Sequence, residues 1–489
     1  MSEPGVNQPE KSVVDRTATE ATPGVKSPLN SLEHLPSELL NGILASLPDV
    51  KSLVSATSSC RAMYSTFKES ESIILSSVLS NSLGVGILPI ATMTYKCSPP
   101  FYSDNLAPYV LFHTLEQVET LETYISNFVT RLEPPTPSSI KWTMRDAIAV
   151  ENYHRQVVLK LTEKFIQACR AIPSPCLDIG RSLQASPPSS SEKERIARSL
   201  YHFEIFRRLF GYLGKMQDRD LHKCAMTFFS KFAPWENAQL ACIHDFLARQ
   251  IVPAFNDIAR HDVVWGEHSI ELDTSFDDAM IQDLLASGLE RILQIASAKS
   301  YREREALLTV FEMPPGVNNV FLMYYFEGIE ELDPEEDDAL DILEAPAFFP
   351  DEDIGAEQIW RMSLNYDPSR DFAIYDALDW TYRECGYVFW DQERLQALGA
   401  LTPPWKPAER SPQNYSPISL KEVYDSWRER SAIYKRGGRG CWSKGDGTRV
   451  VWPYRKNSSA DTNIRVPFIP ESLPEAKEFW QTFLKLNIS

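Results

Sequence analysis

Apolar residues that recur three and four positions apart dominate this sequence. The spacing runs through five segments in the middle of the chain: 116–132, 144–172, 195–214, 237–252 and 280–295. Residues at i, i+3 and i+4 share one face of an α-helix, so each segment is predicted to be a helix with one buried side. Because no fixed-period repeat occurs, we expect a mainly α protein with a large irregular helical domain over 81–320.

Three shorter helices are predicted before this domain, within residues 35–67. Pro36 suits the first turn of a helix, Pro48 ends that helix, and Asp49 can cap the next one. The first helix is expected to turn Leu40 and Leu44 toward the core. Three helices of this size bury too little area to be stable alone, so they need neighbours or a partner.

The order of residues in this stretch closely resembles an F-box motif. The features that carry the resemblance are the Leu35-Pro36 start, the apolar pairs four residues apart, and Cys60-Arg61 followed by Met63. The final tryptophan of many F-boxes is absent, and Met63 stands where bulkier apolar residues are common. Three further stretches are more loosely similar to stretches in large uncharacterised F-box proteins of filamentous fungi. They lie at Trp235-Glu236, 385–391 and Gly440-Cys441-Trp442.

The resemblance implies a three-helix F-box over 31–80 in the substrate-recognition subunit of an SCF (Skp, cullin, F-box) ubiquitin ligase. Such a subunit makes no bond itself and holds a protein substrate near the ubiquitin-conjugating enzyme, which raises its effective concentration. The residues expected to contact the Skp adaptor are Leu35, Pro36, Leu39, Ile43, Leu53, Cys60 and Met63. Two alternatives stay open: an F-box scaffold acting outside a ligase, and an enzyme in the helical body.

Composition limits the class of partner and the cellular compartment. The formal net charge is −18 and the pI is near 5.0, which disfavours nucleic acid as the main partner. No run of about eighteen apolar residues predicts a membrane span. Residues 1–30 are predicted to be a disordered arm without a secretory signal. Eight cysteines without CxxC pairs indicate a reducing compartment, cytoplasmic or nuclear.

The C-terminal region, 321–489, is rich in aromatic residues and is expected to pack on the helical domain. Its insertion 331–357 contains no lysine, arginine or histidine and is predicted to be a solvated acidic loop. Residues 371–395 are predicted to form a tightly packed helix pair.

Residues 428–456 are the only strongly basic segment, and its cations alternate with aromatic residues. Gly445-Asp446-Gly447 predicts a small β-hairpin within it. Three interpretations remain: a solvated face, a site for an acidic or phosphorylated peptide, and a nucleic-acid patch. For the second, arginine forks suit phosphate oxygens, and the candidate substrate-binding residues are Arg436, Arg439, Trp442 and Arg449.

The sequence contains few motifs that suggest catalysis or metal binding. No catalytic, cofactor or metal site is assigned. The sequences GxSxG, GxxxxGK[ST], GxGxxG and HExxH do not occur. The pairs His222/Cys224 and Cys242/His244 mirror each other, but helical residues two apart point in nearly opposite directions. Cys441, between Arg439 and Lys444, has cations that favour a thiolate, but without a partner histidine it is predicted to be inert.

Overall fold

The computed structural model describes eleven stretches of the chain, and they are mainly helical with one two-stranded sheet. This confirms the predicted mainly α class. The described residues are 35–97, 115–133, 140–171, 179–211, 219–272, 279–308, 321–322, 325–326, 341–364, 380–402 and 419–453. The predicted arm 1–30 and residues 331–340 and 371–379 lie outside them.

Five helices form the N-terminal part. They are α1 (Ser37–Ala45), α2 (Val50–Thr57), α3 (Arg61–Glu69), α4 (Glu71–Leu83) and α5 (Leu88–Lys96). Pro36 precedes α1, and Asp49 caps α2 by accepting a hydrogen bond from the Ser52 amide at 2.7 Å. The inner side of α1 buries Leu40 and Leu44, as predicted from their spacing.

The body contains the five predicted helical segments. Its elements are α6 (Leu115–Thr130), α7 (Met144–Tyr153), the π-helical turn η3 (His154–Val158), α8 (Leu159–Ala171), α9 (Ile179–Ala185), α10 (Ser190–Phe210), α11 (Arg219–Phe229), α12 (Pro234–His261), α13 (Val263–Glu267), α14 (Ala279–Ala286), α15 (Leu289–Ser297) and α16 (Tyr301–Leu308). Helices α10 and α12 pack against each other and are buried along most of their length. They therefore form the centre of the core.

The N-terminal helices share this core. The predicted boundary at residue 80 falls inside α4, which packs on α1 and α7. Glu151 of α7 accepts hydrogen bonds from the Val50 amide at 3.2 and 3.3 Å and from the Ser82 hydroxyl. A buried carboxylate thus ties the start of α2 to the body. Among the described helices none alone is long and apolar enough to cross a membrane; α4 and α5, bent by 115°, meet that test by length and composition only as a pair.

The C-terminal part consists of short elements. They are α19 (Gly355–Leu364), α20 (Trp380–Glu384), the 3-10 turn η4 (Tyr387–Phe389), α21 (Gln392–Ala397), α22 (Leu420–Lys435), β1 (Arg439–Gly440) and β2 (Val450–Val451). Strands β1 and β2 pair antiparallel, with Arg439 opposite Val451, and Ser443 bridges to Asp446 in the connection. The predicted hairpin around Gly445 is therefore confirmed.

Part of the acidic insertion is not a solvated loop, which corrects the prediction for 341–357. Asp351 and Asp391 each lie 2.7 Å from the fully buried guanidinium of Arg195 in α10. Glu236 of α12 accepts the Phe348 and Phe349 amides at 2.9 and 3.2 Å. Burying Arg195 requires carboxylate partners, and the insertion supplies two of them, Asp351 and Asp353.

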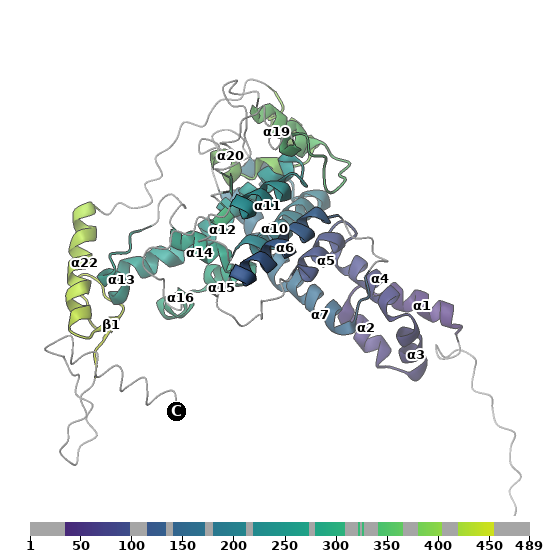
Figure 1. The fold of residues 1–489 in the computed structure, drawn as a ribbon, viewed down its shortest axis with the longest axis horizontal. Helices are drawn as coiled ribbons and strands as arrows, with labels where there is room; N and C mark the ends of the chain where they lie inside the picture. Colours follow the sequence, from purple (N-terminus) through teal and green to yellow (C-terminus); the bar gives the residue numbers. More distant parts are fainter. Residues whose placement is uncertain are drawn as a thin grey trace, which may run out of the picture.

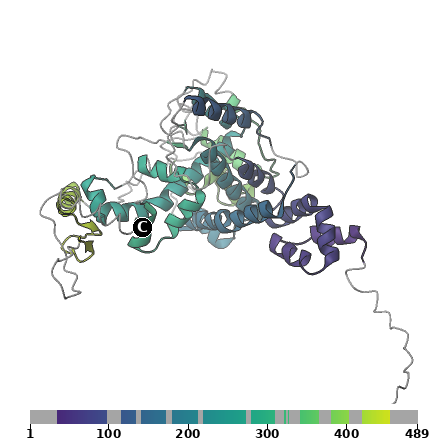
Figure 2. The same cartoon turned by 60° about the horizontal axis from the view of Figure 1, so that its bottom comes forward.

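The two ends of the molecule are far apart. In both views α1–α3 (purple) lie at one end and α22 with the strands (yellow-green) lies at the other, with the body between them (Figures 1 and 2). A surface at one end is therefore well separated from a surface at the other.

Candidate functional site

The N-terminal helical unit, residues 35–69, exposes apolar side chains from all three of its helices. Leu39 of α1 is 55% exposed, Val54 of α2 is 38% exposed and Tyr64 of α3 is 52% exposed. Pro36, just before α1, is exposed as well. A single exposed leucine is ordinary, whereas several in one small unit favour a surface for a partner.

Five of the seven residues expected to contact the Skp adaptor keep some exposure. Pro36 and Leu39 are exposed, and Leu35, Ile43 and Cys60 are half-buried.

Leu53 and Met63 do not: they are 0% and 4% exposed, which reassigns them from partner contacts to the core. The helical period explains the error, because Leu53 shares the inner side of α2 with Val50 and Met63 shares that of α3 with Phe67. Their neighbours Val54 and Tyr64, one position on, are rotated outward. The i, i+4 pair Met63 and Phe67 was the signal that could have placed Tyr64 on the surface.

Gly42 lies on the outer side of α1, between Leu39 and Ile43. A Cβ built there would meet nothing within 4 Å. Glycine in a helix interior costs about 1 kcal/mol relative to alanine, and no contact within the described part of the chain requires it here. Its effect is to let another backbone or side chain approach α1 closely.

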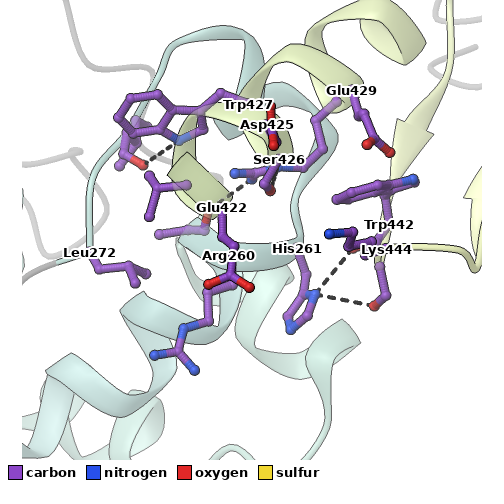
Figure 3. Close-up of a pocket in the computed structure, with 15 residues that line it drawn as sticks. Arg260, His261, Leu272, Glu422, Asp425, Ser426, Trp427, Glu429, Trp442 and Lys444 are labelled. Atoms are coloured by element: carbon purple, nitrogen blue, oxygen red, sulfur yellow. Dashed lines mark hydrogen bonds between the residues drawn. The ribbon is translucent and has the colours of Figure 1, made fainter. Parts of the chain in front are cut away.

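A second candidate site is a pocket of about 250 Å³ at the opposite end of the molecule (Figure 3). It lies between the end of α12, residues 270–272, α22 and the connection from β1 to β2. Its apolar lining comes from Ile270, Leu272, Val423, Trp427 and Trp442.

Buried polar bonds build this pocket. Arg430 of α22 is buried and donates from one nitrogen to the carbonyls of Ala259 and Asp262, each at 2.8 Å. Burial lowers the pKa of Arg430 to about 10. The carbonyls at the end of a helix lack partners within it, so Arg430 acts as a side-chain cap for α12.

The two indoles of the pocket are held in place. Trp427 Nε1 donates to the Ile270 carbonyl at 3.3 Å. The Trp442 amide donates to the His261 carbonyl at 2.8 Å, and its ring packs in a small cluster with Val263 and Val450. Both rings are therefore set before any ligand arrives.

The charged rim of the pocket comes mainly from α22. Glu422, Asp425 and Glu429 stand at i, i+3 and i+7, which places them along one side of the helix. Hydrogen bonds from Ser419 lower the pKa of Glu422, and Lys444 on the facing connection lowers it further. The pocket therefore has an apolar interior and carboxylates on its rim.

The predicted substrate-binding residues separate in the structure. Trp442 lines the pocket. Each arginine instead lies over an aromatic ring: Arg436 over Trp452 at 5.0 Å, Arg439 over Tyr434 at 4.2 Å and Arg449 over Tyr301 at 5.1 Å from the ring centroid. Two of these rings, Trp452 and Tyr434, belong to the basic segment itself, so part of its alternation of basic and aromatic residues serves internal cation–π contacts.

The cysteine and histidine candidates are placed in the core or beside it. Cys441 is buried, and burial raises the pKa of its thiol despite the flanking cations. Cys242 and His244 are buried, and His244 lies 3.2 Å from the Gln282 side chain. Among the described residues no three His, Cys, Asp or Glu side chains gather as metal ligands.

Other buried ionised groups serve packing. Asp245 of α12 and Arg383 of α20 pair at 2.7 Å, and this contact with a cation holds the pKa of Asp245 far below its ordinary value despite burial. Glu204 pairs with Arg207 and Arg208, which lowers its pKa to about 2. These carboxylates are committed to internal partners.

Comparison with known proteins adds no relative: no protein-family model, curated protein or solved structure matches the chain. Function is therefore argued from the residues of this chain.

Proposed function

We propose that the protein is the substrate-recognition subunit of an SCF-type ubiquitin ligase, bound to the Skp adaptor through residues 35–69. The observation that carries the proposal is the outward apolar set Pro36, Leu39, Val54 and Tyr64 on helices whose inner sides are already filled. The F-box-like order of residues supplies the identity of the partner.

The exposed side chains offer enough energy for a specific contact. Fully burying one large apolar side chain contributes about 1.5–3 kcal/mol. Leu39, Val54 and Tyr64, each partly exposed, therefore offer several kcal/mol together, to which close approach over Gly42 adds packing. The surface suits a persistent protein partner.

The position of this surface also suits binding of the Skp adaptor. Its place at one end leaves the body and the opposite end free to hold a client (Figure 1). The protein would then act by proximity, raising the effective concentration of client lysines near the conjugating enzyme.

The test is recovery of the adaptor by full-length protein carrying Leu39→Glu. A charge at a 55% exposed position costs the fold little but repels an apolar partner surface. The matched control is Leu159→Glu on α8, where the leucine is 45% exposed. We expect Skp and cullin to copurify with wild type and the control and to be lost from Leu39→Glu.

The outcomes separate the alternatives. Retention of Skp by Leu39→Glu would overturn the assigned surface. Skp without cullin would favour the scaffold acting outside a ligase. If blocking the proteasome increases client recovery on wild type but not on Leu39→Glu, which retains its clients with or without the inhibitor, the ligase role is supported.

The predicted acidic or phosphorylated client has its own test. Neutralising Arg436 and Arg439 to glutamine should release such a client while Skp is retained. Unchanged client recovery would remove the basic segment as its reader.

A further inference from the structure

The pocket beside α22 has room for one large side chain. Its volume of about 250 Å³ lies below the roughly 300–1,000 Å³ of most small-molecule sites. Trp427 and Trp442 lie on opposite sides of it, and Ile270, Leu272 and Val423 complete an apolar interior (Figure 3). A side chain from another protein matches this size.

The interior is preorganised. The Trp427 indole is fixed by its bond to the Ile270 carbonyl, and the Trp442 ring is fixed by Val263 and Val450. A rigid aromatic pair loses little conformational entropy when an occupant enters between its rings.

The rim favours a cation. Glu422, Asp425 and Glu429 line it together with Lys444 and Arg260. Asp425 is paired with Arg428 at 2.9 Å, so Glu422 and Glu429 are the carboxylates that an incoming cation would meet. The Arg260 guanidinium points away from the indoles, and the third cation, Arg430, is buried against the carbonyls of α12 (Figure 3).

We propose that this pocket takes a lysine or arginine side chain from a basic segment of a client protein. The long stem of either residue is apolar and suits the interior, while its tip is cationic and suits the carboxylates. Tryptophan is also the best aromatic partner for a cation. That the bound segment belongs to a client rests on the proposed function. Binding of a basic peptide in the pocket does not depend on that function.

Lys444 sharpens the inference because it is the chain's own cation at the rim. Lys444 and Glu422 both line the pocket, and the charge of Lys444 contributes to the lowered pKa of this carboxylate. An incoming lysine or arginine therefore competes with Lys444 for the same carboxylate. Removing Lys444 should strengthen binding of a basic peptide and weaken binding of an acidic one.

The experiment selects peptides on immobilised full-length protein. The probe is a positional-scanning library of ten-residue peptides, each pool with one fixed residue, phosphoserine included. We expect pools with fixed lysine or arginine to be retained. Selection of aspartate, glutamate or phosphoserine would overturn the proposal in favour of an acidic client, and selection of no residue would overturn it outright.

The selected peptide is then measured by fluorescence anisotropy against matched variants. Glu422→Gln with Glu429→Gln should weaken binding about tenfold, as should norleucine in place of the peptide's lysine. Lys444→Ala should strengthen binding about threefold, by removing the competing cation. The control, Glu290→Gln with Glu393→Gln, removes two exposed carboxylates on α15 and α21 and should change nothing.

Skp recovery from the same preparations separates this inference from the proposed function. If the glutamine pair binds the peptide as wild type does, the pocket is wrong, whatever Skp does. If peptide binding behaves as expected and Skp is not recovered, the basic-peptide site stands and the ligase role falls.

Discussion

The two ends of the molecule are attached in different ways. The N-terminal helical unit joins the main core through apolar side chains such as Leu44, Leu53 and Phe67. The C-terminal unit, residues 419–453, has a small cluster of its own around Val263, Trp442 and Val450. It is held to α12 and α13 by this cluster and by hydrogen bonds from Arg430 and Trp442.

The difference matters because apolar burial is not directional, whereas hydrogen bonds are. A unit held by burial tolerates changes at its outer face, so residues 35–69 can keep an apolar surface for a partner. A unit whose apolar cluster is small depends more on each of its directed bonds. Damage should therefore stay local at the C-terminal end and spread at the N-terminal end.

The largest effect is expected from Arg430→Ala. The change leaves the buried Ala259 and Asp262 carbonyls without their donor and should cost about 4 kcal/mol of local stability. Hydrogen exchange should rise over 419–453 and stay unchanged in α1–α3. The exposed Arg428→Ala is the control, with little effect expected; faster exchange in α1–α3 would contradict local attachment.

Leu53→Ala should come next. It removes a fully buried side chain and should lower the free energy of unfolding by about 3 kcal/mol. Because this side chain belongs to the main core, exchange should rise in α4 and α7 as well as in α2. Val54→Ala, at the next and exposed position, should cost much less in urea unfolding. Equal losses would mean that Leu53 faces outward.

Acidification should affect two regions of the body with opposite sign: η3 with α7, next to the N-terminal unit, and the end of α12, next to the C-terminal unit. Burial lowers the pKa of His154, in η3 beside α7, to about 4. Between pH 6.5 and 4 the unfolded state therefore binds more protons, and stability falls as pH falls, by about 2 kcal/mol at pH 5. Burial instead raises the pKa of Asp262, next to the C-terminal unit, so lower pH favours its folded form.

Hydrogen exchange at pH 7 and 5, corrected for intrinsic rates, checks this difference. Exchange in α7 and η3 should rise more than exchange in α22. His154→Gln should remove most of the pH dependence, while the exposed His268→Gln should not. Similar pH dependence in His154→Gln and wild type would assign the effect to other groups.

The smallest effect is expected from Gly42→Ala. This change should raise the stability of the fold but lower the affinity for the adaptor. Alanine should stabilise α1 by about 0.5–1 kcal/mol, since its Cβ meets nothing. If a partner approaches α1 closely, the same Cβ should weaken Skp binding. A thermal melt with an adaptor pull-down measures both; stabilisation without loss of binding would place the partner away from this helix.

Much of the fold followed from local pattern. The apolar period predicted the helices of the body, Pro36 and Pro48 bounded α1, and Gly445-Asp446-Gly447 marked the hairpin. Each of these signals lies within a few residues of the structure that it predicts. The acidic insertion was misjudged because its partner, Arg195, is 156 positions away from Asp351.

The candidate sites show the same limit. The sequence identified the N-terminal unit, but periodicity alone did not tell Leu53 from Val54 or Met63 from Tyr64 as the outward residue. It grouped Trp442 with three arginines that instead lie over separate rings. The pocket beside α22 was not predicted at all, since its walls come from four separate segments.

The sequence by itself determined that the protein is mainly helical, where the main helices of the N-terminal unit and the body lie, where the hairpin turns and which short unit carries excess apolar surface. These depend on backbone sterics and on spacing along one helix. Only the tertiary structure decided which apolar residues stay outside, which charges are paired, and that Trp427 and Trp442 enclose a carboxylate-rimmed pocket. Those outcomes depend on contacts between residues far apart in the chain, which no local pattern encodes.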